Sequence, residues 1–454
     1  MSQSETGGGA DGLVAGAGAG ADGLVAGIPR QAAPPKVDQP VDQPVAGLVA
    51  GPVALARPVL GAVPVVRLAD RIEAAVAGGF HTFTGRVLGP YQAATVRIGF
   101  ALVFTLQLLR EWPHRRVLYG DRSPWGLDLA RQLLAGNHAF TVLVWSDSRW
   151  WFEAVYLFAV LAGILLMLGW RTRATSVLFM VAVLSLQNRS VLIGDGGDNI
   201  VHLMAIYLVF TRCGAVWSLD ARRRGRGPGR VGHDVAGVLL WAALGGLLAA
   251  AQLAGRVDWL GATWPYLGWG VVFWTLWAVA GAWYAVNRWW PQSEPRAVLD
   301  ALATMLHNCA LLVIAVQVVL VYSTAGWYKV QGSRWQDGTA LYYPMHLDYF
   351  APWPWLSGVL GTSAVLVFLL SYGTVLVQVA FPFTLMNRRL KNVLLAVMML
   401  EHLGIAVVLG LPIFSLAMIT ADAVFLPTAA LVWFAGRVRR TARWGRAPML
   451  RLLR

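Results

Sequence analysis

The residue in this sequence best suited to chemistry is a lysine at position 329. It lies in the stretch YSTAGWYKVQGSRWQDGTALYY, which directly follows a membrane-length apolar run, and lysine occurs at only three positions in the chain. Its aromatic neighbours, among them Trp327 and Trp335, are expected to shield the amine from water. A shielded amine can lose its proton and act as a base or as a Schiff-base nucleophile. The alternative is that Lys329 is an interfacial anchor, with its ammonium group at the membrane surface.

A second polar stretch, LQNRSVLIGDGGDN, covers residues 186–199. It places Asn188 and Arg189 near the end of an apolar run, and Asp195 and Asp198 follow in a glycine-rich turn. A charge at membrane depth needs a partner, so we expect Arg189 to pair with one of the two aspartates at the mouth of a cavity. The alternative is a helical hairpin in which Asp198 caps the second helix.

Further ionisable residues interrupt apolar runs. Glu401 and His402 lie in VMMLEHLGIAVVLG, and Asp422 lies in ITADAVFLP. Such groups face the interior of a helix bundle, where they serve function or form a structural ion pair. For His202 and His307 we expect hydrogen bonds between helices. The expected cavity is lined by Lys329 and Arg189 together with Asn188, Asp195, Asp198, Trp327, Trp335, Asp337, Glu401 and His402.

The composition indicates an integral membrane protein built from helices. Of the 454 residues, 57% are hydrophobic and 13% are charged, whereas soluble proteins carry about 25% charged residues. The net charge is +14, but the arginines gather between apolar runs, which favours a role in membrane orientation over nucleic-acid binding. No sequence motif for a zinc peptidase, an ATPase or a dinucleotide site is present, and no metal site is expected.

The apolar runs predict an all-α bundle of about ten transmembrane helices, because about 20 apolar residues cross a bilayer. The ranges are 92–110, 151–169, 174–193, 199–213, 235–254, 266–287, 301–325, 357–384, 392–410 and 412–435.

Arginine placement predicts the orientation, because basic residues concentrate in cytoplasmic connections. With ten spans and both termini in the cytoplasm, the basic segments at 171–173, 221–230, 387–391 and 437–446 all fall on the cytoplasmic side of the cell membrane. The segment 111–150 then lies outside despite its arginines. Lys329 and the glycine-rich turn also lie outside, which predicts that they share an outward-facing cavity.

The chain divides into three predicted parts. Residues 1–64 repeat GLVAG and VDQP and are rich in Gly, Ala and Pro, which predicts a disordered cytoplasmic tail and no signal peptide. Residues 65–436 hold the membrane domain. Residues 437–454 form a basic cytoplasmic tail.

Three blocks of the sequence resemble the HTTM (horizontally transferred transmembrane domain) family. They are NRSVLIGDGGDNIVHLMAIYLVF with the following WSLD, the stretch around Lys329, and EHLGIAVVLGLPIFSLAMI. The family includes vitamin K-dependent gamma-glutamyl carboxylase and bacterial membrane proteins such as the sporulation-delaying toxin maturation type. The resemblance extends from about residue 91 to 426.

The resemblance implies a role for Lys329. In the carboxylase, a lysine in an AG-x-x-K motif, followed by a tryptophan, deprotonates a reduced quinone. Here Ala325, Gly326 and Lys329 match that motif, and Trp335 follows at a spacing one residue longer than in the carboxylase. The carboxylase also has a histidine in an N-H-S stretch, where this chain has Arg189. Arginine stays protonated and cannot replace that histidine in proton transfer. Gamma-glutamyl carboxylation itself is therefore not expected, whereas a quinone-like lipid remains a candidate cofactor.

Two functions follow as expectations. The first is an enzyme-like protein that acts on a quinone-like lipid or modifies a small secreted peptide at the outward-facing cavity, with Lys329 as the candidate base and Arg189 as its electrostatic partner. The second is a non-catalytic membrane chaperone or transport component for an exported peptide. The expected partners are the lipid bilayer and such a peptide.

Overall fold

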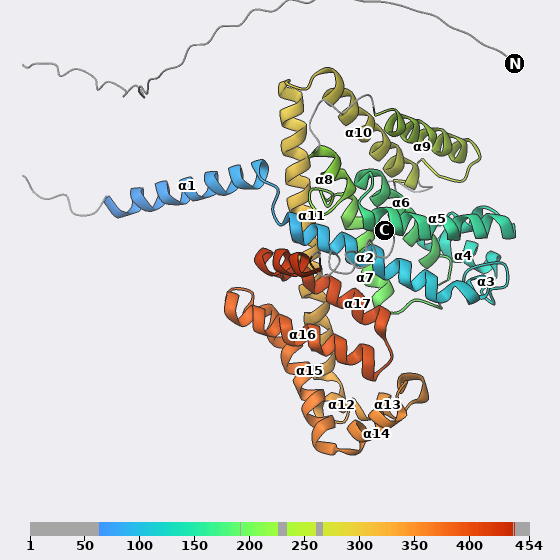
Figure 1. Cartoon of the computed structure of the whole chain (residues 1–454), viewed down its shortest axis with the longest axis vertical. Coiled ribbons are helices and arrows are strands. Elements are labelled where there is room, and N and C mark those ends of the chain that lie inside the picture. The colour runs from blue at the N-terminus through green and yellow to red at the C-terminus, as the bar shows by residue number, and fades with distance from the viewer. Residues whose placement is uncertain (1–62, 191, 226–233, 260–266, 439, 441–454) are drawn as a thin grey trace, which may run out of the picture. The chain divides into compact units, whose positions relative to one another are not determined.

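The computed structural model of the chain describes residues 63–190, 192–225, 234–259, 267–438 and 440 (Figure 1). All but the last two residues of the expected disordered tail, and nearly all of the expected basic C-terminal tail, lie outside these residues. The described residues from Val65 onward form one compact unit. The described part of the chain is helical and holds no β-strand, which confirms the predicted all-α class.

The helices follow one another with short connections. The first half contains α1 (Val63–Gly85), α2 (Pro90–Glu111), α3 (Arg115–Leu118), α4 (Leu127–Asn137), α5 (Arg149–Leu168), α6 (Thr172–Gln187), α7 (Gly196–Val209), α8 (Leu219–Arg224) and α9 (Val235–Leu253). The second half contains α10 (Trp269–Trp289), α11 (Glu294–Gln331), α12 (Ser333–Gln336), α13 (Tyr342–Met345), α14 (Pro354–Thr362), α15 (Ala364–Thr384), α16 (Arg388–Val408) and α17 (Pro412–Asp422). Short 3-10 turns lie at Trp112–His114, Leu143–Trp145, Asp348–Phe350 and Ala423–Phe425.

Each of the ten predicted ranges contains a helix, but the helices differ in length. Among the described residues, seven are long and apolar enough to cross a membrane: α2 with its continuation to Leu118, α5, α9, α10, α11, α15 and α16. By contrast, α6, α7 and α17 have 16, 14 and 11 residues. At 1.5 Å per residue even α6 extends only about 24 Å, less than the roughly 30 Å hydrocarbon core of a bilayer. The predicted count of ten spans is therefore not confirmed.

Several boundaries differ from the expected ranges. The range 412–435 is divided, because α17 ends at Asp422 and a further helix covers Thr428–Val438. The range 357–384 is divided at Ser363, whose side chain accepts a hydrogen bond from the Leu366 backbone and begins α15. The range 301–325 is part of the 38-residue helix α11, which is roughly 57 Å long. Its only proline is at the N-terminal end, where a helix tolerates it, so nothing in the sequence ends the helix before Gly332.

The core of the unit is a group of helices around α2. Helix α2 packs on α5 and α17, α6 lies between α5 and α7, and α17 also contacts α7 and α16 (Figure 1). In the most apolar 18-residue stretch of each helix, about 61% of the residues of α2 are buried, compared with 11% for α9 and 6% for α10. The latter two pair through Trp241 and Trp277, whose rings stack at 4.1 Å and whose indole nitrogens each donate to the other residue's carbonyl oxygen. The α9–α10 hairpin thus leaves most of its apolar surface uncovered.

A buried arginine in α2 fixes the ends of two neighbouring helices. Arg97 is fully buried, and its guanidinium donates to the carbonyl oxygens of Leu166 and Met167 at the end of α5. It also donates to Cys213 O at 3.2 Å and Trp217 O at 2.8 Å, in the segment after α7. Carbonyl groups at helix C-termini lack partners within the helix, so this one side chain satisfies several of them.

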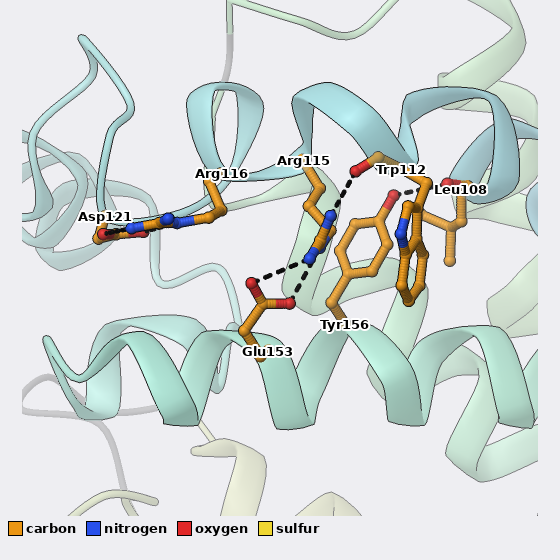
Figure 2. A network of polar contacts seen from close by, with 7 residues as sticks. All are labelled: Leu108, Trp112, Arg115, Arg116, Asp121, Glu153 and Tyr156. Atoms are coloured by element: carbon orange, nitrogen blue, oxygen red, sulfur yellow. Dashed lines mark hydrogen bonds and ion pairs between the residues drawn. The ribbon is translucent and has the colours of Figure 1, made fainter.

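Three of the five arginines between residues 111 and 150 are paired with carboxylates. Figure 2 shows Arg115 held between the ends of α2 and α5, where its Nε and Nη2 contact Glu153 at 2.9 and 3.1 Å. Arg116 pairs in the same way with Asp121, and Arg131 contacts Asp128 and Asp147. The Arg116 guanidinium holds the pKa of the Asp121 carboxyl below its ordinary value. These arginines therefore have structural partners, which accounts for basic residues in a segment expected to lie outside.

Candidate functional site

Lys329 lies in the last turn of helix α11, which continues past the apolar run into the polar, aromatic stretch. Gly326 lies one turn earlier, where α11 touches α15. A Cβ atom at this glycine would lie 2.8 Å from Cγ2 of Val379 and 3.4 Å from its backbone nitrogen. The absence of a side chain at Gly326 therefore allows the close approach that brings Lys329 to Gln378 of α15.

Lys329 is joined to Glu401 through an amide. Its Nζ donates to Oε1 of Gln378 at 2.9 Å, and Nε2 of Gln378 donates to Oε1 of Glu401 at 2.7 Å. The Gln378 side chain is 5% exposed and has both of its polar atoms satisfied in this chain of contacts. The Gln378 amide therefore bridges Lys329 and Glu401 by two hydrogen bonds and keeps the two side chains out of direct contact.

A pocket of about 320 Å³ adjoins Lys329. The Lys329 Nζ lies 5.2 Å from the centre of the Trp335 ring, in the position of a cation–π contact. The other lining residues are Val330, Gln336, Tyr372 and Val375. The wall is mostly apolar and aromatic with a single amine, which suits a flat, largely apolar ligand that carries one acidic or oxygen-rich group.

A second buried network lies two turns along the same helix. Tyr322, seven residues before Lys329 and about 10 Å away along the helix axis, donates to Oδ2 of Asp422 at 3.1 Å. The Tyr322 hydroxyl also lies 2.9 Å from Nε2 of His402. With its hydroxyl proton donated to Asp422, the Tyr322 oxygen can accept a hydrogen bond from Nε2 of His402 in the tautomer that carries a proton there. The remaining nitrogen of His402 and the other oxygen of Asp422 are buried and have no partner among the described residues.

The residues of the glycine-rich turn have different partners from those expected. Arg189 is buried and donates to the carbonyl oxygen of Trp125 at 2.9 Å, and no contact in the described part of the chain joins it to Asp195 or Asp198. The predicted pairing is therefore wrong, because the guanidinium turns toward the segment before α4.

Asp195 and Asp198 have structural partners at the start of α7. Asp195, and not Asp198 as expected, is the N-cap: it accepts from the backbone of Gly197 at 2.6 Å and of Asp198 at 3.0 Å. Asp198 accepts in return from the Asp195 backbone and also from Gln107 of α2. Both carboxylates therefore satisfy orphan groups at a helix terminus.

The remaining expected residues divide between these regions. Asn188 donates to Phe140 O at 2.9 Å beside Arg189. Trp327 is 62% exposed, and Asp337 is an exposed residue that holds its own turn by accepting from Thr339. The hydrogen bond expected between helices is present for His202, which contacts Gln187 of α6. His307 of α11 instead contacts the backbone of Leu88 and Arg212, in the connections before α2 and after α7.

The structure thus brings together Lys329, Trp335 and, through Gln378, Glu401. His402 belongs to the neighbouring network with Tyr322 and Asp422. Asn188, Arg189, Asp195 and Asp198 form a separate group. Phe414 of α17 lies between the groups: its ring meets His402 edge-on at 5.7 Å, and its Cα would be 3.0 Å from a Cβ at Gly197. The lining residues of the pocket beside Lys329 include none from the turn.

Sequence reasoning missed Gln378, which links Lys329 to Glu401. Its signal was present, because Gln378 is a lone amide within the apolar run TVLVQVAFPF. In the part of the chain that the structure describes, no group of three or more His, Cys, Asp or Glu side chains is arranged to hold a metal ion. Comparison with protein-family models, with curated proteins and with solved structures gave no match to this chain.

Proposed function

We propose that the chain is an integral protein of the cell membrane, of HTTM type, that acts through Lys329 on an amphipathic ligand held in the adjoining pocket. The observation that carries the proposal is the amine's surroundings. It lies half-buried at the wall of an apolar pocket and hydrogen-bonds to the neutral amide of Gln378. A carboxylate in direct contact would favour the ammonium form, whereas an amide oxygen accepts a hydrogen bond without adding a charge.

In this proposal Lys329 is the base. The neutral amine takes a proton from an acidic hydroxyl of a quinone-like lipid: the ligand O–H bond breaks, an N–H bond forms, and the resulting oxyanion lies beside the new ammonium group. Gln378 orients the amine, and Glu401 lies behind it as a balancing charge. Arg189 is left out of the reaction, because its hydrogen bond goes to Trp125 O.

The test uses the purified full-length protein. Gentle detergent extraction followed by mass spectrometry is expected to find a quinone-like molecule bound to the wild type and lost or reduced in Lys329→Ala. Lys391→Gln is the matched control, because Lys391 bonds only to a backbone carbonyl in the described part of the chain. Equal ligand content in all three proteins would remove Lys329 from the site.

A second candidate function has its own supporting observation. The last turn of α11 and the segment after it expose large aromatic side chains, among them Tyr328, Tyr349 and Trp355 with 73, 83 and 69% of their surface exposed. Such a surface suits a non-catalytic chaperone or transport component that holds an exported peptide. Charge alone would then be sufficient at position 329. Lys329→Arg is expected to keep full function under this reading and to lose it if the amine is a base, because arginine does not release its proton.

The proposed orientation has both termini in the cytoplasm and Lys329 on the outer side. Labelling of single cysteines from outside intact cells, at Gly194 and at Gln331, tests it. Labelling of only one of the two would place the glycine-rich turn and the end of α11 on opposite sides.

A further inference from the structure

Two arginines lie over a tryptophan ring, with a third nearby, at the end of the unit where α6 and α11 begin and α10 ends. The guanidinium carbon of Arg173 lies 4.4 Å from the centre of the Trp283 ring, and that of Arg212 lies 6.0 Å from the same ring. Arg224 of α8 lies close enough for its charge to act on Arg173. Side chains from four separate segments therefore converge on one place.

The positive charge of this group is only partly balanced. Arg212 pairs with Asp300, at 2.6 Å between Nη2 and Oδ1, and its buried Nε has no partner among the described residues. Arg224 donates to the backbone carbonyl of Gly214, which carries no charge. The Arg173 side chain stacks on Trp283 and makes no hydrogen bond or ion pair to the rest of the chain that the structure describes. One carboxylate thus faces three guanidinium groups.

The place is open to a ligand. Arg173 and Arg224 are exposed residues, and Trp283 belongs to α10, in whose most apolar 18-residue stretch only 6% of the residues are buried. Guanidinium groups recognise phosphate oxygens through paired N–H donors, and a stacked guanidinium is already held in position for such contacts. Basic pockets between membrane helices on the cytoplasmic side bind phosphate-bearing lipid headgroups.

We propose that Arg173, Arg212 and Arg224, with Trp283 as a platform, form a binding site for a phosphate group. The phosphate can belong to an anionic lipid headgroup or to a soluble phosphate. The site lies at the opposite end of α11 from the Lys329 pocket and shares no residue with it, so its test does not depend on the chemistry proposed for Lys329.

The experiment is native mass spectrometry of the full-length protein in detergent with added phosphatidic acid, with phosphatidylcholine as the comparison lipid. Wild type is expected to retain phosphatidic acid preferentially, and Arg173→Gln to bind it at least about tenfold more weakly, because hydrogen bonds to charged groups are the strong ones. Arg223→Gln on α8 is the matched control, an exposed arginine outside the site, and should bind as the wild type does. Folding of each variant is checked by thermal unfolding. Arg173→Lys keeps the positive charge and loses the paired N–H donors of the guanidinium, so it is expected to bind with intermediate strength.

The outcomes separate the sources of the phosphate. Displacement of the lipid by millimolar inorganic phosphate supports a site for soluble phosphate, and resistance to it supports a lipid headgroup. Equal retention of phosphatidic acid by wild type, Arg173→Gln and Arg223→Gln overturns the proposal, as does equal retention of phosphatidylcholine and phosphatidic acid by the wild type.

Discussion

Replacing Arg97 by methionine tests whether one buried guanidinium holds the centre of the bundle together. The side chain donates four hydrogen bonds to carbonyl oxygens at the end of α5 and after α7. Hydrogen bonds to charged groups contribute about 1.5–3 kcal/mol each, so a simple sum would exceed 6 kcal/mol. The variant no longer has to bury a charge, which offsets part of that loss, and we expect a net cost of about 3–5 kcal/mol.

The assay uses a natural reporter beside the site. Cys213 is buried, and its own carbonyl oxygen accepts from Arg97, whereas Cys309 is exposed and is first replaced by serine. A thiol-reactive dye then reads local opening around Cys213. With about 1.4 kcal/mol per factor of ten, the expected cost corresponds to labelling at least about a hundredfold faster in Arg97→Met.

The control is Arg110→Met, on the same helix but exposed, for which we expect a change within about 0.5 kcal/mol. If Arg97→Met labels Cys213 within threefold of the parent protein, the four carbonyl contacts do not stabilise this region and the reasoning fails.

Three further predictions concern the local features that position the sites. Asp195→Ala removes the N-cap of α7 and should cost about 1 kcal/mol in thermal or denaturant unfolding, and an unchanged stability would contradict the capping geometry. Gly326→Ala places a Cβ against Val379 of α15. This contact should lower the free energy of unfolding by about 1–3 kcal/mol, which exceeds or offsets the gain in helix propensity. Gly373→Ala is its control, because nothing lies within 4 Å of that position and stability should rise; equal effects of the two variants would refute a close helix contact. Arg171 forms an ion pair with Asp234, the N-cap residue of α9, with Nη1 2.8 Å from Oδ2. The hydrogen bond from Arg171 lowers the pKa of Asp234, so the stabilisation by this ion pair is present above the unfolded pKa of about 3.9 and is lost as the pH falls through the lower folded pKa. The melting temperatures of wild type and Asp234→Asn should therefore differ at pH 6 and converge below pH 4, and a constant difference would count against the ion pair.

The helices were predictable because the apolar runs are long and continuous, but their ends were less so. The segment 412–435 reads as one apolar run, yet α17 ends at Asp422, which turns inward to meet Tyr322. Likewise, the sequence DGGDN offers two aspartates as caps three residues apart, and spacing alone does not choose between Asp195 and Asp198.

The candidate site was predictable in its central residue and not in its assembly. A rare lysine among aromatic residues identified Lys329, and the interrupted apolar run identified Glu401. Their connection depends on Gln378 and on the contact that Gly326 permits between α11 and α15, which are set by packing between segments distant in sequence. Arg189 was expected to pair with a nearby aspartate, but a backbone carbonyl some 60 residues away satisfies it.

Helix α11 carries Asp300 near one end and Lys329 near the other, with no proline or break between them. The two residues are about 44 Å apart along a single rod, at 1.5 Å per residue. A rod of this kind moves as one body, so a change of tilt at the arginine-rich end would displace the amine by a comparable amount. Distance measurements between spin labels at the two ends of α11 and one fixed point on α5 should then change together when phosphate is added, and independent changes would show that the helix bends.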